Sequence, residues 1–383
     1  MAQPVNVRDA FEVDAPMTVG LEEELMLLNP HTFDLAPRAA TVLERVAGDP
    51  RFKAELPAAQ LEIVLPPAAT VGEAATALAA ARADLAAAAT GVAVVAGAGA
   101  HPFADVEGTL SGGERYEAIA DEYGWAARRQ LAFGQHVHVA VRPAERALAV
   151  YNALRSYLPL VAALAANAPF YGGVDTGLAS VRPKLCDLLP RQGVPPPMAS
   201  WDELEGAMRW GIAAGAMVHH AQWWWEARLH PLFGTLEVRV PDTQTTVAEA
   251  AAVAAVVHAL VAWLAERHGA GDTPPVAPSW RIAENRWSAC RHGLEGTMAD
   301  LVSGAVAPTR ARAAALLDDL EGAAERVGCA AELAAARAGL ARARAGAEPA
   351  RPALLNGAAR QRTAAAGGGP RGVAAWLAER FLG

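Results

Sequence analysis

Lysine and cysteine are scarce in this chain of 383 residues, and each shortage excludes a class of site. Lysine occurs only at Lys53 and Lys184, and neither stands in the Gly-Lys-Ser/Thr context of a phosphate-binding P-loop. The three cysteines, Cys186, Cys290 and Cys329, include no Cys-x-x-Cys pair. This small, odd number argues against a disulfide framework and a structural zinc site, and it favours a reducing, cytoplasmic setting.

Long hydrophobic runs and an excess of basic residues are also missing. The longest apolar run, 250–264, contains His258 and is shorter than the roughly 20 residues that cross a bilayer, so we expect a buried helix and no membrane partner. The first sixteen residues hold three acidic side chains and no apolar block, unlike a secretory signal. Thirty-three Lys and Arg residues stand against 41 Asp and Glu, a net charge of -8, which disfavours nucleic acid as a partner.

The chain is rich in apolar residues, at 53% against 19% charged, as is typical of a globular protein. Short segments of strict polar–apolar alternation are separated by long Ala-rich stretches, a pattern that predicts an α+β fold. We expect strands at 18–28, 60–65, 92–96, 135–141 and 234–240. We expect helices at 72–90, 144–166, 201–217, 246–267, 309–327, 329–346 and 372–382.

The alternation in four of these strands divides apolar from chemically active side chains, because successive side chains on a strand point to opposite faces. One face of each is apolar. The other faces carry four carboxylates, two imidazoles, one amide and one guanidinium: Glu22, Glu24, Glu62, Glu237, His136, His138, Gln60 and Arg239.

Two interpretations of this polar face remain open. A solvated sheet face is the commoner cause of alternation, but such faces usually mix Thr, Ser, Lys and Glu. Carboxylates gathered on one sheet would repel one another strongly unless cations lay between them. Oxygen-rich sites with one imidazole suit Mg²⁺ or Mn²⁺, and an arginine beside such ligands is common in phosphoryl transfer. We therefore predict ATP chemistry on a metal-bearing face.

Six motifs follow one another along the chain. They are GLEEE at 20–24, QLE at 60–62, HPF at 101–103, QHVHV at 135–139, DTG at 175–177 with Ser180 and Arg182, and GTLEVR at 234–239 followed by Asp242. In this order they resemble the carboxylate–amine ligases, and more narrowly the bacterial glutamate–cysteine ligase type 2 family, whose catalytic domain is related to glutamine synthetase and guanido kinases. The match runs from about residue 15 to 295, ending with ENRW at 284–287 and RHG at 291–293.

The resemblance implies a curved antiparallel β-sheet that carries the active site and is backed by helices, as in glutamine synthetase. We assign residues 15–300 to this catalytic domain and 301–383 to an Ala- and Arg-rich helical C-terminal region packed on it. In the family, ATP phosphorylates a substrate carboxylate and an amine then attacks the acyl phosphate. The prototypical substrates are L-glutamate and L-cysteine, although activity on that pair can be weak, and a homodimer is expected.

The resemblance also implies site residues, carried over motif by motif. The metal ligands would be Glu22, Glu24, Glu62, His138 and Glu237. The catalytic residues would be Arg239, Arg182 and Glu62. The nucleotide contacts would be His136, Arg239 and His101. Three further residues are candidates for substrate binding. Arg228 is a cation near the carboxylates, and Asn167 and Thr176 lie in a loop after a long predicted helix.

Two positions depart from the family pattern. The chain reads Trp225-Glu226-Ala227-Arg228-Leu229 where Trp-Asp-x-Arg-Pro is frequent, and Cys186-Asp187 where an aromatic–acidic pair is usual. The residues predicted to bind metal and ATP match the family pattern. The identity of the substrate does not rest on matching residues. A ligase of the same chemistry for a different acid and amine, and a non-catalytic relative that binds nucleotide or amino acid, therefore stay open. His219, His220 and His230 lack metal-ligand spacing and are interpreted as structural.

Overall fold

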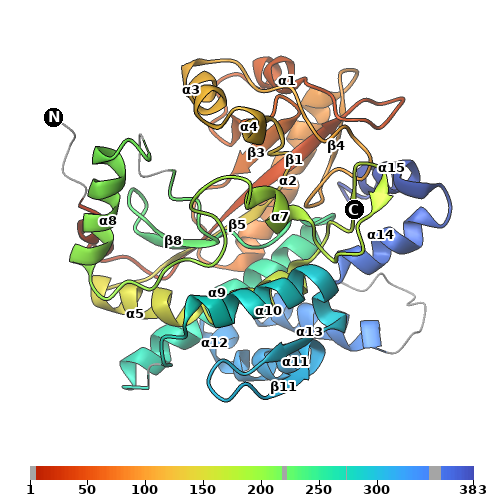
Figure 1. The fold of residues 1–383 in the computed structure, drawn as a ribbon. Coiled ribbons are helices and arrows are strands. Elements are labelled where there is room, and N and C mark those ends of the chain that lie inside the picture. The colour runs from red at the N-terminus through yellow and green to blue at the C-terminus, as the bar shows by residue number, and fades with distance from the viewer. Residues whose placement is uncertain (1–5, 218–221, 273, 345–354) are drawn as a thin grey trace.

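A seven-stranded antiparallel sheet organises the molecule (Figure 1). The computed structural model describes residues 6–217, 222–272, 274–344 and 355–383. The strand order is β2-β3-β1-β5-β9-β8, and β4 also pairs with β1. These strands are β1 (Val19–Leu28), β2 (Phe52–Ala54), β3 (Gln60–Val64), β4 (Val94–Ala96), β5 (Gln135–Ala140), β8 (Ala227–His230) and β9 (Thr235–Val238). All five predicted strands belong to this sheet, and the predicted α+β class with its antiparallel sheet is confirmed.

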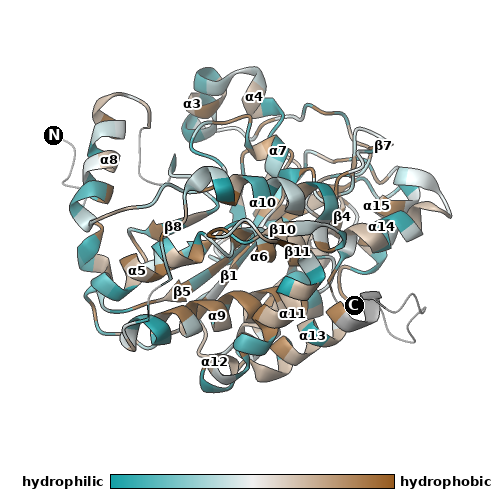
Figure 2. Ribbon diagram, turned by 60° about the horizontal axis from the view of Figure 1, so that its bottom comes forward, coloured by the Kyte–Doolittle hydropathy of each residue, from teal (hydrophilic) through white to brown (hydrophobic). Residues whose placement is uncertain are grey.

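One face of the sheet is apolar and packs on helices α2 (Val71–Ala89), α5 (Ala144–Leu154) and α9 (Val247–Gly269). Leu21, Leu61, Val137 and Leu236 come from four strands and are all fully buried in this core. Helix α9 begins with a capping box between Thr246 and Glu249. By length and composition it is the one described helix that could span a membrane, but most of it lies inside the protein core. The predicted buried helix over 250–264 is confirmed (Figure 2).

The other elements surround this two-layer core. The helices are η1 (Arg8–Phe11), α1 (Ala39–Arg45), α3 (Glu114–Tyr123), α4 (Trp125–Arg128), α6 (Leu158–Ala165), α7 (Arg182–Cys186), α8 (Trp201–Ala213), α10 (Ser279–His292), η3 (Gly293–Glu295), α11 (Thr309–Asp319), α12 (Glu321–Arg326), α13 (Ala330–Arg344), α14 (Gly357–Ala365) and α15 (Gly369–Glu379). Two small hairpins pair β6 (Phe170–Tyr171) with β7 (Val174–Asp175) and β10 (Thr297–Ala299) with β11 (Val306–Pro308).

Several predicted helices are shorter or divided. The predicted helix over 144–166 is two helices, α5 and α6, bent by 64°; Pro159 in the first turn of α6 lacks the N–H that a continuous helix would need. Helix α8 ends at Ala213 because Gly215 takes a φ of +69°, so the prediction to 217 was too long. The predicted helix 309–327 divides at Leu320 into α11 and α12. His219 and His220 lie outside the described residues.

The C-terminal helices pack against the central sheet and its helices, and the predicted helical tail is confirmed. Helix α13 packs on α9, and α15 contacts β4 (Figure 1). The fully buried Arg82 of α2 pairs with Glu23 of β1 at 2.8 Å and donates 3.0 Å hydrogen bonds to the carbonyl oxygens of Thr245, Gln244 and Phe381. The last turn of the described chain is therefore attached directly to the centre of the sheet.

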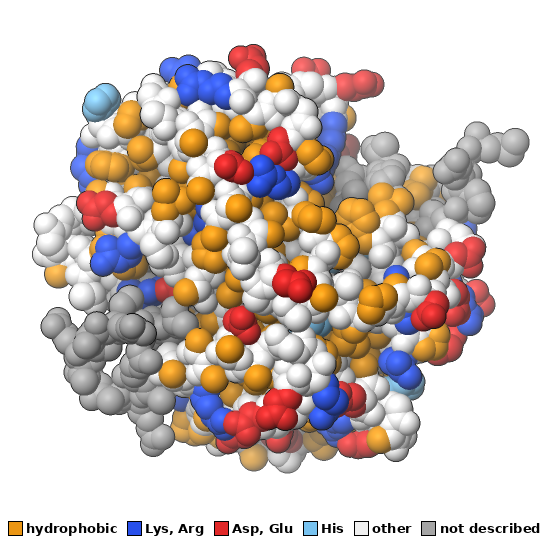
Figure 3. All heavy atoms as spheres, turned by 180° about the vertical axis from the view of Figure 1, so that it is seen from behind, with side chains coloured by type: hydrophobic (Ala, Val, Ile, Leu, Met, Phe, Trp, Pro, Cys, Tyr) orange, Lys and Arg blue, Asp and Glu red, His pale blue; other side chains and the backbone are white. Residues whose placement is uncertain are grey.

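The surface on the far side from the view of Figure 1 carries acidic and basic side chains interspersed with small apolar ones (Figure 3). Exposed salt bridges also occur in the described structure, such as Arg326 with Glu266 at 2.5 Å. On the described part of this face, charge of one sign does not extend over a broad area.

Candidate active site

The polar face of the sheet brings the predicted carboxylates and imidazoles together, and strand register is the cause. Cross-strand neighbours on an antiparallel sheet lie about 5 Å apart. The register pairs Glu22 with His136, Glu24 with Glu62, His138 with Glu237, and Arg228 with Glu237. All of these side chains except Arg228, which lies on the edge strand β8, belong to interior strands and so can meet partners from both neighbouring strands.

Glu22 stands at the centre of this group. Its carboxylate lies 3.1 Å from Nδ1 of His136 and 3.4 Å from Nε2 of His138. Burial alone would raise the pKa of Glu22, but the two neighbouring imidazoles, of His136 and His138, hold it well below its usual range. Burial lowers the pKa of His136 to about 4, so this imidazole is neutral at pH 7.

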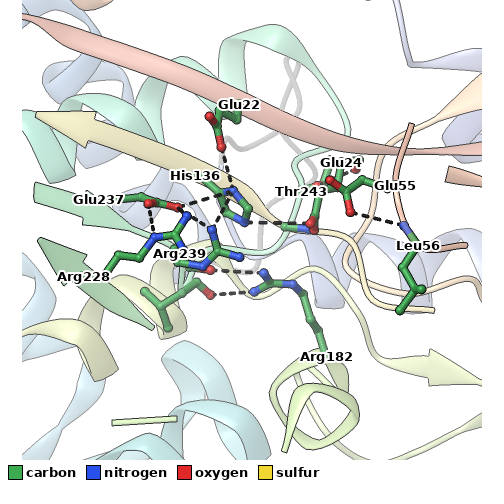
Figure 4. A network of polar contacts seen from close by, with 12 residues as sticks. Glu22, Glu24, Glu55, Leu56, His136, Arg182, Arg228, Glu237, Arg239 and Thr243 are labelled. Carbon is green, nitrogen blue, oxygen red and sulfur yellow. Dashed lines mark hydrogen bonds and ion pairs between the residues drawn. The ribbon is translucent and has the colours of Figure 1, made fainter. Parts of the chain in front are cut away.

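Glu237 is fully buried and is held by two guanidinium groups (Figure 4). Arg228 donates from Nε to one carboxylate oxygen and from Nη2 to the other, the latter at 3.2 Å. Arg239 donates to the carboxylate as well, and it approaches Nδ1 of His136 to 3.4 Å. Although burial raises the pKa of Glu237, the two arginines hold it well below its ordinary value, so this carboxylate is charged.

Two groups of three side chains place their ligand atoms within 4.8 Å of one another, close enough to hold a metal ion. One is Glu22, His138 and Glu237; the other is Glu22, Glu62 and His136. Nε2 of His138 and Nε2 of His136 are buried and have no hydrogen-bond partner. Oxygen donors with a single imidazole, and unpartnered imidazole nitrogens aimed among carboxylates, fit Mg²⁺ or Mn²⁺.

Glu24 and Glu62 differ from this pattern. Burial raises the pKa of Glu62 well above its ordinary value, and the nearby charges of Glu55, Glu22 and Glu24 add to the shift. Burial also raises the pKa of Glu24, to about 7. Glu24 accepts a hydrogen bond from the N–H of Gly134 and belongs to neither three-residue group. The structure thus brings four of the five predicted metal ligands into these two groups, while Glu24 lies 4.0 Å from Nε2 of His136 and also lines a neighbouring pocket.

That pocket is polar and lies at one end of the site. Glu24, Arg182 and Arg239 line it, opposite Glu55 and Arg115. Arg182 donates to the carbonyl oxygens of Arg239 and Val240, at 3.1 and 3.2 Å. A Cβ atom at position 134 would lie 2.0 Å from this guanidinium, so glycine is required there for Arg182 to reach the site.

A second pocket, largely apolar, lies at the other end. Leu21, Val64, Pro66, Pro67 and Phe233 line it, together with Glu22 and His138. The ring of Phe233 stacks on His230, with centroids 4.2 Å apart. The candidate metal ligands therefore lie between a polar pocket and an apolar one.

Three predicted ligand contacts have their polar atoms used within the protein. His101 faces the carbonyl oxygen of Phe33 at 2.8 Å through Nε2, and its Nδ1 accepts from two backbone N–H groups. Asn167 is fully buried and bonds to Thr243, Thr245 and Gln361. Thr176 closes a turn by donating to the carbonyl oxygen of Pro169 at 2.8 Å. None of the three lines either pocket, so these geometries support a structural role.

The sequence patterns did not reveal the wall of the polar pocket formed by Glu55, Arg115 and Tyr116. Glu55 lies in the short connection before β3, where no alternation marks it. Helix α3 carried a signal that could have been used, since Tyr116, Ile119 and Tyr123 recur at helical spacing. Strand β8, which presents Arg228, was also missed because it has only four residues.

Comparison with known proteins agrees with this architecture. The family model described as glutamate-cysteine ligase family 2 (GCS2) matches residues 18–367. A Rubrobacter xylanophilus protein provisionally named glutamate–cysteine ligase 2-3 is 40% identical over 331 residues, which covers 84% of this chain and 88% of the relative. A Thermobifida fusca protein provisionally named glutamate–cysteine ligase 2 is 36% identical over 331 residues, covering 84% and 83%.

Two solved structures share the fold at low sequence identity. The glutamate–cysteine ligase of Francisella tularensis, in complex with AMP, aligns with a TM-score of 0.70 at 11% identity, over 97% of this chain and 90% of that one. A bifunctional glutathione synthetase from Pasteurella multocida aligns with a TM-score of 0.62 at 13% identity, over 96% and 52%. With the family match across most of its length, the chain belongs to glutamate–cysteine ligase family 2 and is an enzyme of the type that forms C–N bonds.

Proposed function

We propose that the protein is an ATP-dependent carboxylate–amine ligase that joins L-glutamate to L-cysteine, with weak activity on that pair, through an acyl phosphate. The observation that carries this proposal is the position of Glu22, His138 and Glu237 between a polar and an apolar pocket. Such an arrangement allows a nucleotide to approach from one side and an amino acid from the other. The AMP bound to the Francisella tularensis ligase supports nucleotide binding by this fold.

Divalent cations would be held by Glu22, His138 and Glu237, and by Glu22, Glu62 and His136. Bound Mg²⁺ supplies charge neutralisation on the phosphates and orients them for transfer. Thr235 fixes the ring of His138 through a 2.9 Å contact with Nδ1, which leaves Nε2 directed at the carboxylates.

The apolar pocket suits the base and sugar of ATP, because proline and phenylalanine surfaces offer flat apolar contacts and Glu22 and His138 lie at its inner end. The polar pocket suits the amino acids. Arg239 borders that pocket and also donates to Glu237, so its guanidinium lies where the transferred phosphoryl group would pass. Charge on that group would be stabilised by Arg239, with Arg182 beside it.

The reaction follows from these positions. An oxygen of the substrate carboxylate attacks the γ-phosphorus, the bond to ADP breaks, and a mixed anhydride forms. The amine of the acceptor then attacks the acyl carbon, phosphate leaves, and an amide remains. Exclusion of water from the buried polar face protects the anhydride from hydrolysis between the two steps.

The test is the release of ADP from MgATP by the full chain, with glutamate and cysteine supplied separately and together, and with mass-spectrometric detection of γ-glutamylcysteine. Glu62→Gln keeps the shape of a candidate metal ligand and removes its charge, so it should abolish turnover. Glu44→Gln, on the exposed surface of α1, is the matched control and should retain it.

Each outcome decides between the alternatives. Product formation that requires both amino acids supports the proposal. ADP release with only a different acid or amine would keep the ligase chemistry and overturn the substrate pair. Bound ATP without turnover across a broad panel of acids and amines would favour a non-catalytic relative.

A further inference from the structure

The motif at 284–287 lies on α10 and contributes none of the residues assigned to the reaction. Its Arg286 joins two carboxylates from distant parts of the chain. Nε donates to Glu226 at 2.6 Å, and Nη1 and Nη2 donate to the two oxygens of Asp187 at 3.0 and 2.8 Å. Burial alone would lower the pKa of Arg286, but the two carboxylates raise it above its ordinary value, so this buried guanidinium stays charged.

The contact with Asp187 holds helix α7. Asp187 is the C-terminal cap of this helix, and Nη2 of Arg286 also donates to the carbonyl oxygen of Pro183 in its first turn, at 3.3 Å. The helix begins with Arg182, whose guanidinium donates to the carbonyl oxygen of Arg239 at 3.1 Å (Figure 4). Arg286 therefore holds both ends of the short helix that carries Arg182 into the site.

The contact with Glu226 holds the segment beside Arg239. Glu226 directly precedes β8, and its carbonyl oxygen accepts a 2.8 Å hydrogen bond from the N–H of Arg239. Its own N–H donates to the carbonyl oxygen of Gly193 at 3.1 Å. A Cβ atom at position 193 would lie 3.5 Å from Cζ of Arg286, so this loop also lies against the guanidinium. The backbone partner of Arg239 is thus fixed from two directions.

Arg286 does not reach the polar pocket itself. It is not among the described residues that line either pocket of the site, whereas Pro183, Cys186 and Glu226 line the polar one. Its effect on a reaction must therefore pass through the residues that it holds. Misplacement of a charge-stabilising group by about 1 Å can cost on the order of 100-fold in rate.

The neighbouring Asn285 has a different role and provides a comparison. Its side-chain amide donates to the carbonyl oxygen of Ala299 and accepts from the N–H of the same residue, both at 2.8 Å. These bonds attach α10 to the β10–β11 hairpin, and Asn285 lines neither pocket of the site. Two adjacent residues of α10 thus connect the helix to a peripheral hairpin and to the walls of the polar pocket.

We propose that Arg286 is a positioning residue for phosphoryl transfer, which holds Arg239 and Arg182 in place by bridging Glu226 and Asp187. This assignment rests on the proposed function and adds to it a residue outside both pockets. Binding of ATP should not depend on Arg286, because neither this residue nor the two carboxylates are among those that line the apolar pocket proposed for the nucleotide.

A double-mutant cycle tests this route with the full chain at saturating glutamate, cysteine and MgATP. Arg286→Lys keeps the charge but cannot bond to both carboxylates. We expect kcat for ADP release to fall by about 30-fold, while the Kd for MgATP from calorimetry stays within about threefold. In a protein that already carries Arg239→Lys, the same substitution should lower kcat by about fivefold or less, because the group through which Arg286 acts is already impaired.

Two control variants and one milder variant accompany the cycle. Arg281→Lys changes an arginine of the same helix that donates to the carbonyl oxygen of Leu301, and it should retain kcat. Asn285→Ala should lower the melting temperature and also retain kcat. Asp187→Asn weakens only the contact that holds α7 and should lower kcat by about fivefold, so it decides the question if Arg286→Lys does not fold.

Equal losses of kcat in the two backgrounds would overturn the proposal, as would a lower melting temperature with unchanged kcat, or a loss confined to ATP affinity. A readout without turnover separates this assignment from the proposed function. In protein labelled with ¹⁵N-arginine, the Nε–H signal of Arg239 is identified by its loss in Arg239→Lys. Arg286→Lys should shift that signal and Arg281→Lys should not, even if no acid and amine support ADP release. An unmoved Arg239 signal in Arg286→Lys would show that Arg286 does not position it.

Discussion

Arg228 and Glu237 face each other across β8 and β9, and the guanidinium donates to both oxygens of a carboxylate that has no exposed surface. Arg239 reaches the same carboxylate from its own strand. Glu237 therefore keeps its negative charge inside the protein. Two arginines thus keep a candidate metal ligand charged inside the sheet.

Replacement of Arg228 should be costly for stability. Removing Arg228 leaves the buried charge of Glu237 to Arg239 alone, and Arg228→Leu should lower the free energy of unfolding by about 3 kcal/mol, as measured by urea titration. The exposed pair of Arg326 with Glu266 is the control, because Arg326→Leu should cost less than about 1 kcal/mol. Equal losses in the two variants would contradict the importance of the buried pair.

Arg239→Lys should separate catalysis from binding. Lysine keeps the charge but loses the planar guanidinium, which meets charge that develops during phosphoryl transfer. We expect kcat to fall by about 100-fold while the Kd for ATP changes by less than about threefold. Arg209→Lys, at an exposed position of α8, should leave both values unchanged. A change confined to ATP affinity would exclude the catalytic role.

His101 should make stability depend on pH. Burial lowers the pKa of His101 from 6.5 to about 4. Protonation of Nδ1 would also break the two hydrogen bonds that it accepts from backbone N–H groups. As the pH falls from about 6.5 to 4, the unfolded chain takes up a proton first. The free energy of unfolding should therefore fall over this window by up to about 3 kcal/mol, with no contribution from this group above it.

His101→Gln should remove that part of the pH dependence, measured by urea titrations between pH 4 and 7. His31→Gln, at an exposed position, is the control and should keep the full slope. A slope that survives in His101→Gln would assign the pH dependence to other groups.

Gly357→Ala should destabilise the protein even though alanine favours helices. A Cβ at this position of α14 would lie 2.1 Å from Oδ1 of Asn167, which is fully buried. We expect a loss of about 1–3 kcal/mol by thermal or urea unfolding. Gly322→Ala, in α12, meets only the flexible end of Arg326 at 3.3 Å and should be neutral or slightly stabilising. The same effect in both variants would argue against tight packing at Asn167.

Strict alternation predicted the sheet and most of the candidate site, because Glu22, Glu62, His138 and Glu237 lie on strands whose other face is apolar. Pairing then brings such residues together without further information. Glu55 and Arg115 could not be found this way. Their places depend on a loop and a helix that Ser111 and Tyr116 dock against β2 and β3, and such tertiary contacts leave no periodic trace.

At His101 and Asn167 the geometry favours a structural role over the predicted ligand contact. His101 lies in a matching motif and Asn167 in the loop after a long helix, and both use their polar atoms to fix backbone segments. A motif position shows that a side chain is needed, and only the contacts show whether a ligand or the chain itself needs it.

The bond from Arg82 to the carbonyl oxygen of Phe381 links two residues that are made almost 300 positions apart. Until Phe381 is in place, the guanidinium of Arg82 lacks one of its hydrogen-bond acceptors. Protein synthesis proceeds from the N-terminus, and early segments can begin to fold as they emerge. The sheet that carries the candidate ligands would thus reach its final packing only after residue 381 leaves the ribosome, so a stalled or shortened product would expose an unfinished centre to chaperones and proteases.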